Sequence, residues 1–482
     1  MTASAKNILI LMSDEHRRDA MGCAGHPLVK TPHLDALAAA GTRFSRAYTA
    51  SPMCVPTRAA LACGTYVHQN RYWDSATAYD ASQPSWMHML RDAGYETTSI
   101  GKLHFKSGRH DNGFSEEILP MHIVGEKGWV VGLLREDPPP YDSAAELAAE
   151  IGEGDTSYSE YDRAITDAAV DWLAAPERKQ KPFAGFVSLV SPHYPLKAPE
   201  AFFNLYDPAT LPLPADSIPD HEEIMAMAGF FDYQRYFDEE KMRLAIAAYY
   251  GLVSFMDDCI GRILAALDAA GLTEDTLIIY TSDHGELLGD HGMWTKQVMY
   301  EASAGIPLIM RGAGIPAGKV TANGAHLLDL ASTALTLAGV DQPSHWPGQN
   351  LAAISNAAPD RSRTVFSEYH DGGSTTGSFM VVWDEWKLVW YSGRKPQLFN
   401  LDLDPGEYDN RADDPDAAAA LAEGKKRLFD ICDPEAVSAM AFADQRAHIE
   451  ALGGTEACLN TFVFNATPTP TEQARMSEQG EI

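Results

Sequence analysis

Three short apolar runs, each followed closely by residues that can bind a charged ligand, constrain the fold of this chain more than any other feature. The runs are Asn7–Met12, Phe183–Val190 and Thr276–Thr281, and the polar residues that follow them are Asp14, His193, Asp283 and His284. Continuous apolar runs of this length are typical of parallel strands buried on both faces. Because ligands bind beyond the carboxyl ends of such strands, the polar ends predict one shared site.

Helical patterns separate these runs. Amphipathic segments include Pro32–Ala40, Trp86–Ala93 and Met242–Ala269. Strands alternating with helices predict the α/β class, with a doubly wound sheet flanked by helices. From about Pro359 the pattern changes to short strands with polar turns, over Val365–Tyr369, Phe379–Trp383, Trp386–Tyr391 and Gln397–Leu401, followed by a helix over Ala417–Phe429. This change predicts a smaller C-terminal α+β domain built on a short antiparallel sheet.

We expect three parts in the chain: an α/β domain over residues 1–358, the α+β domain over 359–432, and a C-terminal tail over 433–482. Residues 110–160 form an expected insertion, and its acidic, Pro-led half is more typical of a loop or lid than of a core element. The tail has weak periodicity, and two interpretations stay open. It reaches over a neighbouring subunit, which would favour a homo-oligomer, or it is a partly ordered terminus.

Charge and cysteine content exclude several classes of partner. The net charge of -30 argues against nucleic acid and against an anionic membrane surface. No stretch reads as a membrane span, and the N-terminus does not have the pattern of a signal peptide. The six cysteines are scattered without disulfide or metal-ligand spacing, which suits a reducing compartment. We therefore expect a cytoplasmic protein that acts on a small molecule.

The stretch Cys54-Val55-Pro56-Thr57-Arg58 carries the strongest local signal. On structural grounds alone, Cys54 would be a small buried residue at a helix start, with Pro56 in the first turn and Arg58 in a surface pair. The spacing also places Cys54 and Arg58 on one helix face. The functional interpretation gains weight only from the residues that accompany this stretch elsewhere in the chain.

Two further groups of residues accompany it. Acidic residues converging at strand ends would bind a hard divalent cation, with calcium favoured and manganese or magnesium possible, although Asp14 alone would be explained as a helix N-cap. Basic residues gathered in so acidic a chain indicate that an anion binds beside the cation. Taken singly, each of these basic residues would be explained as a solvated surface residue. The acidic group includes Asp14, Glu15 and Asp283 with His284, and the basic group is Arg58, Lys102, His104, His193 and Lys296.

In order along the chain, these motifs resemble a type I sulfatase of the alkaline phosphatase superfamily, and most closely its choline sulfatase-like branch. The resemblance covers Thr31-Pro32-His33-Leu34-Asp35, the Cys54 stretch, Gly101-Lys102-Leu103-His104, Ser191-Pro192-His193, Ser282-Asp283-His284-Gly285 and Asp290 to Lys296. It implies an alkaline phosphatase-like mixed sheet. It also implies hydrolysis of a sulfate monoester to an alcohol and inorganic sulfate.

The resemblance implies that a separate formylglycine-generating enzyme oxidises Cys54 to formylglycine, whose hydrate attacks sulfur. It implies that Arg58 orients this hydrate. Lys102, His193 and Lys296 then hold sulfate oxygens, and His104 assists breakdown of the intermediate. The implied metal ligands are Asp14, Glu15, Cys54, Asp283 and His284.

The implied alcohol site is less complete, because this chain departs from the branch. An asparagine that contacts sulfate in the branch is matched here by Ser75, with Asp74 as the neighbouring candidate. Trp129 and Glu368 could supply part of a cage for a quaternary ammonium group, although core packing explains a lone tryptophan equally well. The alcohol stays open among choline-like, sugar and aryl groups.

Three alternatives differ in reaction or in class. Formylglycine-dependent phosphonate monoester and phosphodiester hydrolases of the same superfamily come second. A non-catalytic sulfate- or metal-binding protein would keep Cys54 as a thiol. A phosphomutase or alkaline phosphatase relative would carry serine or threonine at that position.

Overall fold

The computed structural model describes residues 6–141, 143–215, 217–461, 464 and 466–480. The first five residues of the expected catalytic domain, and residues 462–463, 465 and 481–482 of the expected tail, lie outside this range. One helix, Glu239–Ala269, is long and apolar enough to span a membrane, yet 89% of its most apolar window is buried inside the protein. It is therefore a core helix in this structure.

The central sheet is mixed and has eight strands in the order β11-β2-β10-β9-β1-β7-β4-β5. Strand β1 is parallel to both of its neighbours, β9 and β7, whereas β10 runs antiparallel to β9 and β2. The strands are β1 (Asn7–Asp14), β2 (Thr42–Phe44), β4 (Glu96–Lys102), β5 (Glu116–Met121), β7 (Phe183–Pro192), β9 (Thr276–Ser282), β10 (Leu308–Arg311) and β11 (Lys319–Thr321). The predicted doubly wound mixed sheet is confirmed.

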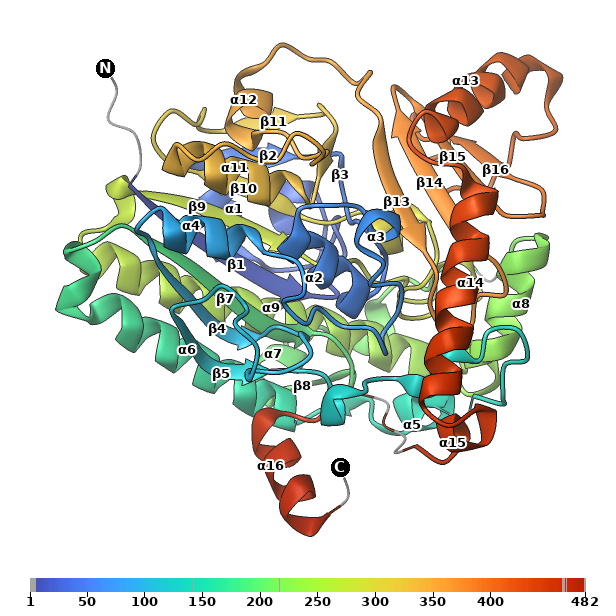
Figure 1. Ribbon diagram of the computed structural model, residues 1–482, viewed down its shortest axis with the longest axis horizontal. Helices are drawn as coiled ribbons and strands as arrows, with labels where there is room; N and C mark the ends of the chain where they lie inside the picture. The colour runs from blue at the N-terminus through green and yellow to red at the C-terminus, as the bar shows by residue number, and fades with distance from the viewer. Residues whose placement is uncertain (1–5, 142, 216, 462–463, 465, 481–482) are drawn as a thin grey trace.

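Side chains that alternate along β1 explain why helices cover both faces of the sheet (Figure 1). Leu9 and Leu11 pack into one apolar cluster, and Ile8, Ile10 and Met12 pack into another. The first cluster contains α1 (Pro32–Ala39), α6 (Ser157–Ala174) and α9 (Glu239–Ala269). The second contains α2 (Cys54–Cys63), α4 (Trp86–Asp92), α11 (Asp329–Ala338) and α12 (Leu351–Asn356).

The C-terminal region forms a second sheet with the antiparallel order β13-β14-β15-β16, as its sequence predicts. Its strands are β13 (Val365–Tyr369), β14 (Ser378–Trp383), β15 (Trp386–Tyr391) and β16 (Gln397–Asn400), and α13 (Ala418–Phe429) follows them. Smaller elements complete the chain: β3 (Ala47–Tyr48), α3 (Val67–Asn70), β6 (Gly152–Glu153), β8 (Lys197–Ala198), α7 (Glu200–Phe203), α8 (Glu222–Phe231), α10 (Glu301–Ala304) and β12 (Ala325–His326).

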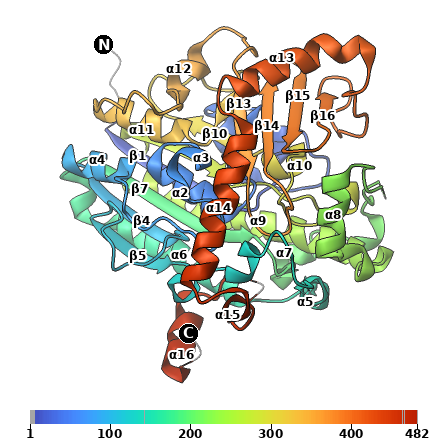
Figure 2. The same ribbon diagram turned by 45° about the vertical axis from the view of Figure 1, so that its right-hand side comes forward.

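Two parts of the chain contain more regular structure than the sequence pattern indicates. Residues 136–160 contain α5 (Ser143–Ala149), and two of its apolar side chains, Ala144 and Leu147, join the larger core cluster, so this part is not only a loop. The expected tail begins with α14 (Pro434–Ala451), which lies along the second sheet and the first domain of its own chain (Figures 1 and 2). Shorter helices α15 (Thr455–Leu459) and α16 (Pro470–Gln479) follow it.

Candidate active site

The pairing register of three strands creates the acidic part of the site. Ser13 is level with Ser282 across β1 and β9, and Asp14 is level with Pro192 across β1 and β7. The residues that follow these positions therefore meet at the carboxyl edge of the sheet. Both Asp14 and Asp283 are fully buried there. The sequence prediction of a shared site at this edge agrees with this geometry.

Cys54 is the first residue of α2 and faces the buried carboxylates. Its Sγ lies 3.0 Å from Nε2 of His284 and 3.5 Å from Oδ1 of Asp14. Burial, and next the Asp14 carboxylate, raise the pKa of the Cys54 thiol well above its ordinary value. Since a thiolate is the nucleophilic form of cysteine, the unmodified thiol is poorly suited to attack at neutral pH.

Arg58 ties the two aspartates together from the next turn of α2. Its Nε donates to Oδ2 of Asp283 at 2.8 Å, and its Nη2 donates to Oδ2 of Asp14 at 3.1 Å. Its Nη1 donates to Ser188 Oγ at 3.0 Å and to the Lys102 carbonyl at 2.9 Å. Arg58 is buried with these partners, so it neutralises charge in the site instead of forming a surface pair.

Lys102 ends β4 fully buried, with its Nζ 2.5 Å from Oδ2 of Asp14. Burial alone would raise the pKa of Asp14. The surrounding cations, Lys102 first among them, hold that pKa well below its usual range. Asp14 is therefore an ionised carboxylate in the folded chain.

The donor set fits a hard divalent cation. One potential ligand atom from each of Asp14, Cys54, Asp283 and His284 lies within 4.8 Å of the others, and all four residues are buried. His284 Nδ1 lies 3.0 Å from the Gly285 carbonyl, which fixes that nitrogen as the N–H and leaves Nε2 with its lone pair facing the cluster. An oxygen in place of the Cys54 sulfur would make this set match the oxygen preference of such ions.

Glu15, the fifth expected ligand, lies in a different group. Its Oε2 accepts from Lys296 Nζ at 2.7 Å, and its backbone has a left-handed φ of 65°. Ligand atoms of Glu15, Asp14 and His193 lie within 4.8 Å of one another, so Asp14 is shared between this group and the four residues above. A non-glycine residue in this conformation costs energy, which is typical of functional sites.

Lys296 and His193 form a linked pair beside Cys54. Lys296 Nζ lies 3.0 Å from His193 Nε2, and His193 Nδ1 lies 2.7 Å from the Tyr194 carbonyl. Although burial acts against it, the Glu15 carboxylate raises the pKa of Lys296. Burial, then Lys296, lower the pKa of His193 well below its ordinary value. The pair is thus a charged ammonium donating to a neutral imidazole.

His104 has no hydrogen-bond partner on either ring nitrogen among the described residues, although it is buried. Burial, followed by Lys102 and Arg58, lowers the pKa of His104 well below its ordinary value. Its backbone also has a left-handed φ, of 54°. A neutral imidazole held in this way is available to bind or accept a proton from a ligand.

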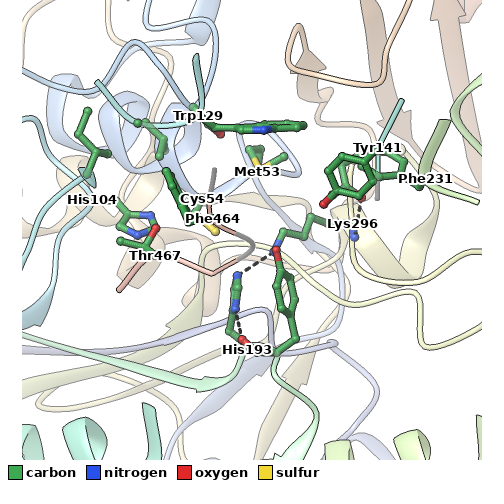
Figure 3. A pocket seen from close by; sticks show the side chains of 16 residues that line it. Met53, Cys54, His104, Trp129, Tyr141, His193, Phe231, Lys296, Phe464 and Thr467 are labelled. Carbon is green, nitrogen blue, oxygen red and sulfur yellow. Dashed lines mark hydrogen bonds between the residues drawn. The ribbon is translucent and has the colours of Figure 1, made fainter. Parts of the chain in front are cut away.

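These groups open into a pocket of about 670 Å³, part of which is open solvent. In Figure 3, Cys54 and Lys296 are drawn between the indole of Trp129 and the ring of His193. Among the other labelled side chains, His104, Tyr141, Phe231 and Phe464 come from segments far apart in the sequence. The described lining consists of Met53, Cys54, Val55, Ser75, His104, Ile123, Gly128, Trp129, Tyr141, His193, Tyr194, Phe231, Lys296, Gln297, Phe464 and Thr467.

The four expected substrate-binding residues separate into two pairs. Ser75 and Trp129 line the pocket. Asp74 and Glu368 are not in its described lining: Asp74 accepts from Gln445 Nε2 at 2.8 Å, and Glu368 accepts from His68 and His370. Glu368 and His370 are fully buried, and His68 is largely so, so the Glu368 carboxylate faces these two histidines and not the pocket.

Several lining residues are missed by the sequence analysis. Tyr141 and Phe231 come from the insertion and from α8, and their rings pack against each other with centroids 5.1 Å apart. Phe464 and Thr467 come from the C-terminal segment. No motif marks these positions, because an aromatic residue in a wall looks like any core residue in the sequence. Gln297 could have been found as the neighbour of Lys296.

Buried cations and neutral imidazoles around a nucleophile position, beside a carboxylate cluster, define a hydrolase site for a tetrahedral anion. The sulfatase family model matches residues 6–340, and a model described as N-sulphoglucosamine sulphohydrolase, C-terminal, matches residues 289–433. The chain belongs to the sulfatase family, and it hydrolyses sulfate esters. This family generally uses a divalent metal and formylglycine, and the buried Asp/Cys/His cluster is compatible with both.

Relatives and solved structures agree with this placement. The chain is 31% identical over 446 residues to a choline-sulfatase of Rhizobium meliloti (strain 1021), covering 86% of this chain and 84% of that protein. It is 30% identical over 442 residues to arylsulfatase K of Homo sapiens, covering 85% and 79%. The phosphonate monoester hydrolase from Silicibacter pomeroyi has a similar structure, with a TM-score of 0.71 and 27% identity over 88% of this chain and 94% of that one.

Proposed function

We propose that the substrate is the sulfate monoester of a small alcohol bearing a quaternary ammonium group, as in choline sulfate. The observation that carries this proposal is the aromatic wall of the pocket, formed by Trp129, Tyr141 and Phe231 near Lys296. Aromatic faces attract such cations by about 0.5–2 kcal/mol each. Similarity to a choline-sulfatase supports the same alcohol.

Charge supports a zwitterion over an anion as substrate. With a net charge of -30, the chain repels an approaching anionic sulfate ester, whereas a sulfate ester of choline has no net charge. The described lining contains no aspartate or glutamate, so the ring faces are left to attract the cation.

The charged groups of the site divide the work around the sulfate. The Lys296 ammonium binds a sulfate oxygen, His193 orients that ammonium, and neutral His104 accepts a proton from the group at position 54. Arg58 and Lys102 hold Asp14 ionised and in place. Formylglycine at position 54 would supply a hydrated aldehyde as nucleophile, and calcium held by Asp14, Asp283 and His284 would supply positive charge.

The preference for a cationic alcohol is testable with a neutral isostere. We expect kcat/KM for choline sulfate to exceed that for 3,3-dimethylbutyl sulfate about tenfold, since the two alcohols differ mainly in charge. Trp129→Leu should reduce this ratio to near one, while the ester of the uncharged alcohol keeps most of its rate. Steady-state kinetics on both esters gives the ratio. Equal kcat/KM values for the two esters in the protein without substitutions would exclude a cation site.

Calcium binding is testable without activity. We expect calcium at about 100 times its Kd to stabilise the protein by about 2.7 kcal/mol, seen as a rise in Tm. Asp283→Asn should lose most of this rise, because it removes a charged oxygen from the cluster. Asp290→Asn is the control, since Asp290 pairs with Arg17 outside the cluster. A larger response to manganese or magnesium than to calcium would contradict the choice of metal.

A phosphonate monoester or phosphodiester substrate is the second candidate, supported by the structural similarity to a phosphonate monoester hydrolase. Lys296 and Lys102 place two ammonium groups near the position of Cys54, which suits the terminal group of a sulfate monoester better than the internal, singly charged group of these esters, so this candidate stays second. Comparing kcat/KM for an aryl sulfate and the matching aryl phosphonate decides between the two reactions. A higher value for the phosphonate would favour this second candidate.

A further inference from the structure

The indole of Trp129 is held by two neighbouring segments. Its backbone N–H donates to the Ser75 carbonyl at 3.1 Å. Its ring packs against Gly372, where an added Cβ would lie 2.5 Å from Cη2 of the ring. No larger residue fits at position 372 without moving the indole. The position of the aromatic wall therefore depends on where Ser75 and Gly372 lie.

One buried carboxylate joins these two segments. Oδ2 of Asp371 accepts from the Ser75 N–H at 2.8 Å and from Ser75 Oγ at 2.6 Å, while Oδ1 accepts from the Gly372 N–H at 2.7 Å. Asp371 is fully buried. Ser75 and Gly372, the two residues that hold Trp129, thus both donate hydrogen bonds to this one side chain.

Placing a carboxylate at this position is electrostatically costly. Burial, and next the neighbouring Asp74, raise the pKa of Asp371 to about 7. Arg135 is a buried cation in the same region, but its guanidinium donates to the carbonyls of His370, Ser374 and Thr376 and to the Gln445 side chain. Asp371 is not among these acceptors. The carboxylate is kept in spite of this cost, because two acceptor oxygens are needed for the three donors of Ser75 and Gly372.

We propose that Asp371 is a positioning residue: it fixes Trp129 through Ser75 and Gly372, and so sets the preference for a cationic alcohol. The inference rests on the proposed function for the alcohol, because Trp129 must contact that group. In this arrangement Asp371 contacts neither Cys54 nor the residues proposed to act on the sulfate. Its replacement should therefore alter the choice between alcohols more than the chemistry at sulfur.

Asp371→Asn tests the role directly. The amide presents an NH2 to either Ser75 N–H or Gly372 N–H, so one of these donors loses its acceptor. We expect the preference for choline sulfate over 3,3-dimethylbutyl sulfate to fall about fivefold through KM, with kcat changed less than about twofold and Tm lowered only modestly, because one buried N–H loses its acceptor. A fall in kcat with an unchanged preference would overturn the proposal.

Two further variants separate positioning from loss of folding. Gly372→Ala should reproduce the loss of preference, because its Cβ displaces the indole, and Gly372 does not have a left-handed φ that would strain alanine. Asp444→Asn is the matched control: its carboxylate also accepts from neighbouring side chains, Arg71 and Trp73, neither of which lines the pocket. Asp444→Asn should leave the preference unchanged, and a loss as large as that of Asp371→Asn would count against the proposal.

A double-mutant cycle distinguishes failure of this inference from failure of the proposed function. If Asp371 acts through Trp129, Asp371→Asn will have no further effect on the preference in a Trp129→Leu background. If the two substitutions reduce the preference independently, so that their effects multiply in the double variant, the positioning role is overturned. If Trp129→Leu alone leaves the preference unchanged, the proposed function is overturned. Fluorine NMR of protein labelled with 5-fluorotryptophan tests the position without substrate: the Trp129 signal should shift in Asp371→Asn but not in Asp444→Asn, and an unmoved signal would refute the proposal.

Discussion

Replacing Cys54 by alanine will reduce sulfate-ester turnover by at least roughly a thousandfold, the size of effect seen when a covalent nucleophile is removed. Cys54 lies within 3.5 Å of both Asp14 and His284, at the point where α2 meets the carboxylate cluster. Substrate binding should survive, since Lys296 and the aromatic wall stay in place. Steady-state kinetics measures the first effect, and isothermal titration calorimetry measures the second.

Cys63→Ala provides the matched control for this prediction. Cys63 is a buried cysteine at the other end of α2 and is absent from the described pocket lining. Its replacement should lower stability modestly and leave kcat intact. Turnover that persists in Cys54→Ala would refute the nucleophile. Peptide mass spectrometry of the protein without substitutions, made together with a formylglycine-generating enzyme, shows whether position 54 carries the aldehyde.

Replacing Arg58 by leucine will destabilise the fold by about 3–5 kcal/mol, because it leaves two buried carboxylates without their shared guanidinium. Arg58 bonds to both Asp14 and Asp283, and all three side chains are almost fully buried. Calcium should recover part of the loss, since a bound cation neutralises the same carboxylates. Urea unfolding with and without calcium measures both effects.

An exposed ion pair gives the comparison for Arg58. Arg262 pairs with Asp167 on the surface, where such pairs contribute about 0–1 kcal/mol, so Arg262→Leu should change stability little. A loss for Arg58→Leu as small as this would mean that the two aspartates do not depend on the guanidinium. A large loss unaffected by calcium would place the cation elsewhere.

Sequence periodicity predicts the sheet and its polar edge well, because these depend on local patterns. The strand carrying Asp14 is buried on both faces, which its unbroken apolar run indicates. The four strands of the second sheet agree with their predicted ranges to within a residue at each end. Helix spacing likewise places Cys54 and Arg58 on one face, and the family resemblance adds Lys296 to the same site.

Contacts between distant segments could not be predicted in the same way. Glu368 was expected in the alcohol site, but its partners His68 and His370 depend on how the second sheet packs against the segment after α2. Asp371 shows no motif, and its role follows only from hydrogen bonds to Ser75. Phe464 reaches the pocket from a region with weak periodicity. Such walls are specified by tertiary packing, which a single sequence does not display.

The burial of Cys54 has a consequence for the timing of biosynthesis. Cys54 is 4% exposed, and the sheet beneath it needs β9, which ends at Ser282, roughly 230 residues later in the chain. At about 5–20 residues per second, a ribosome takes on the order of 10–45 seconds to make that stretch. During this interval the cysteine cannot reach its final place. Any enzyme that oxidises it therefore has a defined window during translation, and a slower ribosome would lengthen that window.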